Sequence, residues 1–166
     1  MKDLKSVLEA SILANIDNQL ESGDKHIKDN IKKWIEENYS LFGGRFKISD
    51  NPNENGLYEV TVASAEVTNK NIISLTNGTF EWKKTPAAFI CSNCSKLTSL
   101  EGAPKEVGGI FDCSYCKSLK SLEGAPENVG ADFKCYGCGE QFTENDVKKA
   151  SKVKGKIQTR WVYKYK

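Results

Sequence analysis

The chain has 166 residues, of which 39% are hydrophobic and 28% are charged. This balance is typical of a folded globular protein and excludes a chain that is disordered throughout. Lysine and arginine number 24 against 22 acidic residues, and the net charge of +2 argues against a general binder of duplex DNA. We expect one ordinary domain, or a small domain with an appendage.

The first twenty residues carry charges among their apolar positions, so they lack the apolar stretch of a signal peptide. No run approaches the roughly 18 apolar residues of a membrane span. We therefore expect a soluble protein with no membrane partner. Six cysteines in a chain without an export signal are expected to be reduced thiols or metal ligands, and not disulfides.

Residues 1–42 have the apolar periodicity of helices. A first row recurs every fourth residue, at Leu4, Leu8, Ile12, Ile16 and Leu20. The segment Ser22–Asp24 predicts a break, with Asp24 as the cap of a second helix whose inner row is Ile27, Ile31, Trp34 and Ile35. We predict a helical hairpin that ends at Gly43 and Gly44, although one long helix that docks on a partner protein would use the same pattern.

Residues 43–66 change to short extended segments, RFKIS and LYEVTV, joined by the loop NPNENG. Residues 67–157 then contain an internal repeat. The two 22-residue units that begin at Phe89 and Phe111 are identical at 13 positions. A third unit from Phe133 keeps two cysteines and then diverges into a short helix that Thr143 can cap, while Ile72 and Leu75 have the leucine spacing of a degenerate opening turn.

One unit cannot bury its own phenylalanine, cysteines and leucines. Units stacked at the strand spacing of about 4.8 Å would place phenylalanine on phenylalanine, cysteine on cysteine and leucine on leucine in a narrow core. The repeat therefore predicts a solenoid. The fold class that we predict is α+β: a helical hairpin, short strands and a small leucine-rich-repeat-like solenoid, closed by a C-terminal helix and strand.

The segment FDCSYCKSLKSLEGAPENVG resembles the leucine-rich repeats of bacterial surface antigens. Over residues 60–157 the chain is also similar to uncharacterised proteins of crAss-like and related Bacteroidales phages, in which segments such as LTNGTFEW, SLEGAP and FTENDV recur. The N-terminal LEASILANIDNQLESGD looks like a start that several phage proteins share. This resemblance implies a phage origin and a repeat fold, but no activity.

Paired cysteines admit two interpretations. Cys-x-x-Cys doublets separated by 18 residues have the spacing of a four-thiolate zinc site, with ligands among Cys91, Cys94, Cys113, Cys116, Cys135 and Cys138. However, the 22-residue period imposes this spacing, and six thiols exceed the four that one ion needs. We favour a ladder of reduced, buried thiols without a cofactor. Stacked thiols would also be close enough for oxidation to join neighbouring turns.

The sequence contains no catalytic constellation. His26 is the only histidine and lies among charged residues, so we expect it to be solvated. Glu101 and Glu123 repeat 22 residues apart in the Gly-Ala-Pro turns, where a structural role is the simpler interpretation. We therefore predict that the protein is not an enzyme.

Positions that differ between similar units are candidates for partner binding. Strand alternation predicts that they face outward, opposite the phenylalanines. Unconstrained surface residues would look the same. The candidates are Ile90, Ser92, Asp112, Ser114, Lys134 and Tyr136.

The C-terminal segment, residues 158–166, alternates aromatic and basic residues. The simplest interpretation is a final strand that covers the end of the solenoid. If the segment is free, its aromatic residues could dock into another protein or stack on bases. These residues are Trp161, Tyr163 and Tyr165.

Together these features predict a non-enzymatic phage protein that binds another protein, phage or host, through the solenoid face, the tail or the N-terminal helical segment. It would act in the virion or, in the host cytoplasm, against a host-defence protein. The alternative is a zinc-stabilised nucleic-acid-binding module that uses the cysteine pairs and the basic tail.

Overall fold

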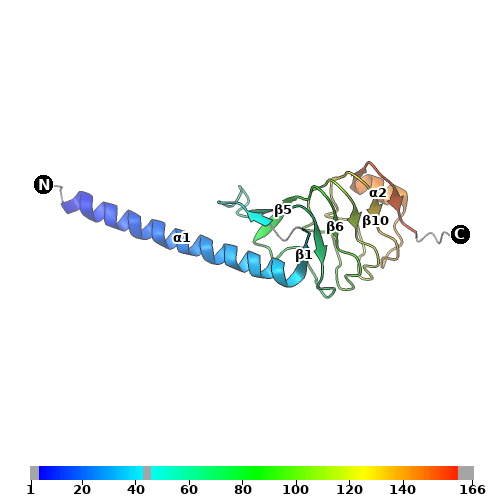
Figure 1. The fold of residues 1–166 in the computed structure, drawn as a ribbon, viewed down its shortest axis with the longest axis horizontal. Coiled ribbons are helices and arrows are strands. Elements are labelled where there is room, and N and C mark those ends of the chain that lie inside the picture. Colours follow the sequence, from blue (N-terminus) through cyan, green and yellow to red (C-terminus); the bar gives the residue numbers. More distant parts are fainter. Residues whose placement is uncertain (1–3, 43–45, 161–166) are drawn as a thin grey trace.

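The structure is a computed structural model that describes residues 4–42 and 46–160. A long helix leads into a body of stacked turns (Figure 1). The elements in chain order are α1 (Leu4–Asn38), β1 (Tyr39–Leu41), β2 (Phe46–Ile48), β3 (Tyr58–Val62), β4 (Ala65–Val67), β5 (Phe80–Lys84), β6 (Phe89–Ile90), β7 (Glu106–Val107), β8 (Phe111–Asp112), β9 (Asn128–Val129), β10 (Phe133–Lys134), α2 (Glu144–Ala150), β11 (Lys152–Val153) and β12 (Ile157–Gln158).

The predicted N-terminal hairpin is wrong, because α1 runs through Ser22–Asp24 without a break. Ser22 satisfies its hydroxyl inside the helix by donating to the carbonyl of Gln19, at 2.8 Å. Asp24 does not cap a second helix; its carboxylate accepts a hydrogen bond from the Tyr58 hydroxyl, at 2.6 Å. The helix therefore continues because tertiary contacts further along the chain outweigh the weak local stop signal of one glycine.

The C-terminal part of α1 packs against the body. Ile31 and Ile35 are fully buried, and the Trp34 ring meets the Phe80 ring edge to face with centroids 5.6 Å apart. The Lys28 ammonium donates to the carbonyl of Asp50 at 2.7 Å. These contacts fix the direction in which the helix leaves the body.

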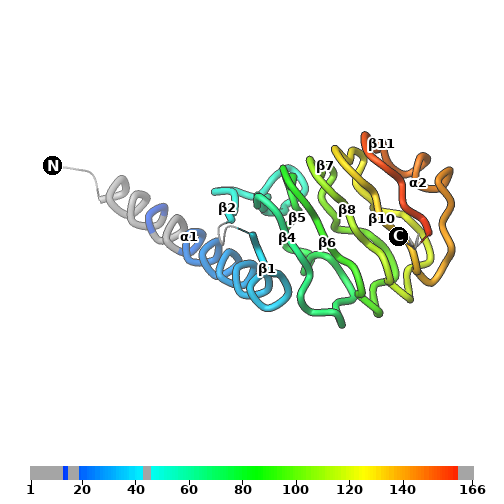
Figure 2. Tube along the Cα trace, turned by 45° about the vertical axis from the view of Figure 1, so that its right-hand side comes forward, coloured from blue at the N-terminus to red at the C-terminus, as the bar shows by residue number. Residues whose placement is uncertain are grey.

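Three sheets build the body (Figure 2). The largest has the order β1-β4-β6-β8-β10-β12, and its strands are parallel from β4 to β12, whereas β1 pairs antiparallel with β4. A second, all-parallel sheet has the order β11-β9-β7. The third has the order β2-β3-β5 and lies against α1, since Tyr58 on β3 contacts Asp24 and Phe80 on β5 contacts Trp34.

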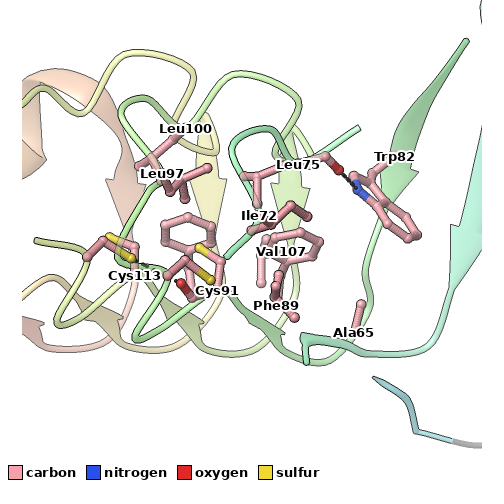
Figure 3. Packing of buried hydrophobic residues seen from close by; sticks show 14 of the residues in the cluster. Ala65, Ile72, Leu75, Trp82, Phe89, Cys91, Leu97, Leu100, Val107 and Cys113 are labelled. Atoms are coloured by element: carbon pink, nitrogen blue, oxygen red, sulfur yellow. Dashed lines mark hydrogen bonds between the residues drawn. The ribbon is translucent and has the colours of Figure 1, made fainter. Parts of the chain in front are cut away.

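The repeat stacks in register, as predicted. Phe89 pairs with Phe111, and Phe111 pairs with Phe133. Their ring centroids are 6.2 and 5.0 Å apart, and all three side chains are fully buried. Leucines, cysteines and valines fill the same narrow interior (Figure 3). The α+β class and the solenoid are confirmed.

The two ends of the coil differ from its middle. Ile72 and Leu75 are buried in the opening turn, as predicted, and the Leu75 carbonyl accepts hydrogen bonds from the Tyr39 hydroxyl and the Trp82 indole. At the other end α2 begins with a reciprocal cap between Thr143 and Asp146. In the part of the chain that the structure describes, neither helix is both long enough and apolar enough to cross a membrane.

Glycine is required where one turn rests directly on the next. A Cβ atom on Gly130 would lie 2.1 Å from the carbonyl oxygen of Gly108, and a Cβ on Gly108 would lie 2.1 Å from that of Pro86. Both contacts are with backbone atoms, which cannot move aside separately. The Val-Gly step of the repeat therefore sets how closely the turns approach.

We predict that Gly23→Ala stabilises the protein by about 0.5–1 kcal/mol, because alanine favours a helix interior and a Cβ there meets no atom within 4 Å apart from the adjacent residues and the nearby backbone of α1. Far-UV circular dichroism and urea denaturation would measure the gain. If residues 22–24 instead formed a turn between two helices, the substitution would lower stability and helix content.

We predict that the matched substitution Gly130→Ala destabilises the protein by about 2 kcal/mol or more, since the new methyl group would overlap the Gly108 carbonyl. Equilibrium urea denaturation of the two variants side by side would check this. A Gly130→Ala variant as stable as the wild type would contradict the close stacking.

Candidate functional site

The first predicted binding column lies where expected. Ile90, Asp112 and Lys134 are aligned across β6, β8 and β10 and are half-buried, on the face opposite the phenylalanines. Glu66 on β4 and Gln158 on β12 continue the column. Sequence reasoning missed these two because their steps to the next turn are 24 residues long and not 22.

The predicted outward position is confirmed for only part of the second column, which consists of Ser92, Ser114 and Tyr136. Ser92 and Tyr136 are half-buried, but Ser114 is 1% exposed, so its predicted outward position is wrong. Strand alternation fails there because β8 ends at Asp112, whose carboxylate accepts a hydrogen bond from the Ser114 N–H at 2.9 Å. Ser114 therefore belongs to a turn and offers nothing to a partner.

An aromatic pair occupies this turn region. The rings of Tyr115 and Tyr136 meet edge to face with centroids 5.2 Å apart, and the Lys117 ammonium lies 5.8 Å from the Tyr115 centroid. Tyr115 has a φ of +60°, a conformation that is rare for a bulky residue. A Cβ on Gly137 would lie 2.6 Å from the Tyr115 ring, so the glycine in the next turn makes room for it.

Lys134 and Tyr136 also line an open hollow of about 1110 Å³ at the C-terminal end of the coil. Lys156, Gln158 and Arg160 contribute to the same lining, together with Phe142 and Glu144. The charged residues of the lining are the basic Lys134, Lys156 and Arg160 and the acidic Glu144, so the hollow carries a net positive charge. The predicted anchors that would follow it, Trp161, Tyr163 and Tyr165, lie outside the described residues.

Three of the exposed large hydrophobic residues in the described part of the chain lie in a row on α1. Leu13 is 61% exposed, Leu20 is 65% exposed and Ile27 is 37% exposed. Residues seven apart lie on nearly the same side of a helix, and this row continues along the face that buries Ile31. The helix extends well beyond the stacked turns (Figure 1), so the body covers only its C-terminal part.

Cysteines form a regular pattern in the interior. The thiol of Cys116 donates to the carbonyl of Cys91 at 3.1 Å, and the thiol of Cys138 donates to the carbonyl of Cys113 at 3.2 Å. In the opening turn the Lys70 ammonium donates to the corresponding carbonyl of Val67. In the second and third doublets the second cysteine thus donates to a carbonyl of the preceding turn that has no partner in the strand pairing, whereas the Cys94 thiol lies 3.8 Å from the carbonyl oxygen of Ser92 in its own turn.

Electrostatics keep most of these sulfurs protonated. Burial raises the pKa of the Cys91 and Cys113 thiols well above the usual range and raises the pKa of Cys135 to about 12. A hydrogen bond with the Cys94 thiol, followed by burial, raises the pKa of Cys116. Cys138 is the exception, because a hydrogen bond from the Cys113 thiol lowers its pKa.

Zinc binding would need thiolates that converge on one point. Within residues 4–42 and 46–160 no three His, Cys, Asp or Glu side chains are grouped so that they could hold a metal ion. The doublets stack turn upon turn, and the thiols of Cys116 and Cys138 donate to backbone carbonyls. That the chain holds no zinc stays a prediction.

No residue was predicted to be catalytic, and the single histidine and the two repeated glutamates make local contacts. His26 is exposed on α1, where its Nε2 atom lies 3.3 Å from the Asn30 amide nitrogen. Glu101 and Glu123 are exposed in the turns, and their N–H groups donate to the hydroxyls of Ser99 and Ser121, at 3.4 Å each. The contacts of the two glutamates are those expected of turn residues.

We predict that the reduced protein retains well below one zinc ion per chain after exposure to zinc and dialysis, as measured by elemental analysis. A chelator should leave its melting temperature unchanged, because the Cys116 and Cys138 thiols already donate to backbone carbonyls of the preceding turn. One zinc per chain, with a melting temperature that falls on chelation, would support the zinc-stabilised alternative.

No protein-family model, curated protein or solved structure matches this chain.

Proposed function

We propose that this chain is a non-enzymatic protein-interaction module, and that the exposed apolar row of α1 is its principal contact surface. The observation that carries the proposal is the exposure of Leu13, Leu20 and Ile27, at 61%, 65% and 37%. Scattered apolar residues on a surface need no explanation, but a row that continues a buried helix face does.

The row supports a protein partner for a physical reason. Burying a leucine side chain contributes roughly 1.5–3 kcal/mol, so three such residues could contribute substantially to an affinity. The face has the period of a helix that lies along another helix or in an apolar groove. A nucleic acid offers no comparable apolar surface along its backbone.

The outward strand column contributes a second, more polar surface. From Glu66 through Asp112 to Gln158 it mixes acidic, apolar, basic and amide side chains, whereas the interior repeats the same residues. Such a pattern suits selective contacts around an apolar anchor. The setting, in a phage particle or against a host-defence protein, follows from the sequence resemblance alone.

The test compares three tagged proteins in infected host cells and in purified phage particles: wild type, Leu20→Asp and Ser22→Asp. Leu20 belongs to the exposed row, whereas Ser22, two residues on, lies on the other side of the helix. Quantitative mass spectrometry of captured proteins should show a partner that Leu20→Asp loses at least about tenfold, corresponding to about 1.4 kcal/mol, and that Ser22→Asp retains.

Circular dichroism controls for folding, which neither exposed substitution should disturb. Light scattering of the pure chain shows whether a second copy covers the row. Identical capture by all three proteins, with the wild type monomeric, would refute the helix as the contact surface.

A further inference from the structure

The coil is open at its C-terminal end. β12 is the last strand of the largest sheet, and in the described part of the chain no strand pairs with its outer side. Ile157 pairs with Phe133 and continues the inward column of the repeat. It is half-buried, whereas the phenylalanines of the column are fully buried. The interior of the coil therefore reaches the surface at this end.

β12 also presents backbone groups on its open side. The carbonyls of Lys156 and Gln158 accept hydrogen bonds from the preceding turn, at 2.9 and 3.0 Å. Backbone groups of successive strand residues point to opposite edges, so the N–H and C=O groups of Ile157 face away from β10. An edge of this kind can pair with a further strand from another chain.

An open hollow of about 1110 Å³ adjoins this edge. Ile157, Gln158 and Thr159 line it from the edge, and Phe142 lines it from the segment that precedes α2. Pockets of about 300–1,000 Å³ hold drug-sized ligands, so the hollow has room for several residues of an extended peptide.

Positive charge is concentrated at this end of the coil. Residues 147–160 contain six of the 24 basic residues and none of the 22 acidic ones, so the rest of the chain has 18 basic against 22 acidic residues. Lys156 and Arg160 of the hollow are exposed, and within the described residues neither forms an ion pair. Such an edge repels a basic strand and favours an acidic one.

We propose that β12 and the hollow beside it form a docking site for an extended acidic segment of a partner protein, which adds a further strand to the largest sheet. The backbone of this segment pairs with Ile157, and its apolar side chains continue the inward column. Its acidic side chains meet Lys134, Lys156 and Arg160. The inference is independent of the function proposed for α1, which leaves the body at the end opposite α2 (Figure 1).

Charge and backbone chemistry favour this occupant over three others. Residues 161–166 of the chain include Lys164 and Lys166 and no acidic residue, so their charge has the same sign as that of the hollow. A second copy that paired through its own β12 would bring the same basic edge. A single-stranded nucleic acid is anionic, but its backbone has no N–H groups to pair with the strand.

The first experiment titrates the full-length chain with a fluorescent eight-residue peptide of alternating valine and glutamate and follows anisotropy. One control peptide has lysine in place of glutamate, which reverses the charge. A second has every peptide nitrogen methylated, which keeps the charge and removes the backbone donors. Both controls should bind at least about tenfold more weakly. Equal binding of the methylated peptide would overturn strand addition, because charge alone would then explain the binding.

The second experiment measures the valine–glutamate peptide against two protein variants with the same net charge. Lys156→Glu combined with Arg160→Glu should weaken binding at least about tenfold. Lys96→Glu combined with Lys120→Glu changes two exposed lysines of earlier turns and should weaken it less than about threefold. Circular dichroism checks folding, and if the first variant does not fold, the peptide controls decide. Equal losses in two folded variants would overturn the site.

The third experiment locates the peptide by amide hydrogen exchange, followed by NMR. The Ile157 N–H should exchange at least about tenfold more slowly in the complex. Val153 is the matched control, because β11 is the outer strand of its own sheet and the N–H groups of Lys152 and Lys154 face β9. Its exchange should not change.

Three outcomes would overturn the proposal. Equal protection of Val153 and Ile157 would mean that the peptide has no preference for the hollow. Strong protection of Ile157 without peptide would mean that the chain itself covers β12, and protection that rises with protein concentration would mean that a second copy does. A thymidine oligonucleotide that binds more tightly than the peptide would identify a nucleic acid as the better occupant.

Discussion

The register of one turn upon the next is the constraint on which the rest of the structure depends. Phe89, Phe111 and Phe133 are paired residue for residue, and the valines of the second sheet follow the same order. Backbone hydrogen bonds between turns hold this register, and the Val-Gly step sets the distance of approach. The core is narrow because each turn supplies only a few apolar side chains. Each of these side chains is buried only when it packs on the equivalent side chain of the next turn.

Much of the coil was predictable because its information is local and repeated. The 22-residue period identifies the inward columns, and Thr143 identifies the closing helix. The continuity of α1 was not predictable in the same way, since the contact between Asp24 and Tyr58 that accompanies it joins residues 34 positions apart. Ser114 was misplaced because the strands are only two residues long, so alternation cannot be extended past Asp112. Glu66 and Gln158 were missed because the end turns have a different length.

The cysteine doublets show how a motif's spacing can have a cause other than ligand geometry. In the second and third doublets the first sulfur is buried in the interior, and the second, of Cys116 or Cys138, donates to a carbonyl of the preceding turn. The same carbonyl position in the opening turn is served by Lys70, a residue with no resemblance to cysteine. A hydrogen-bond donor of suitable reach is what this position needs. The outward surfaces and α1 are free of this requirement, which is why they can differ from turn to turn and are the better places to seek specificity.

The unequal step lengths of the coil have a consequence for how such a chain can change in size. The steps from Phe89 to Phe111 and from Phe111 to Phe133 are 22 residues, whereas the steps at both ends, Ala65 to Phe89 and Phe133 to Ile157, are 24. Duplicating or removing one whole internal unit would leave both terminal turns with their own neighbours and hydrogen bonds. Only the central part of the solenoid is thus modular. A gene that encodes it can add a central repeat without changes to the terminal turns.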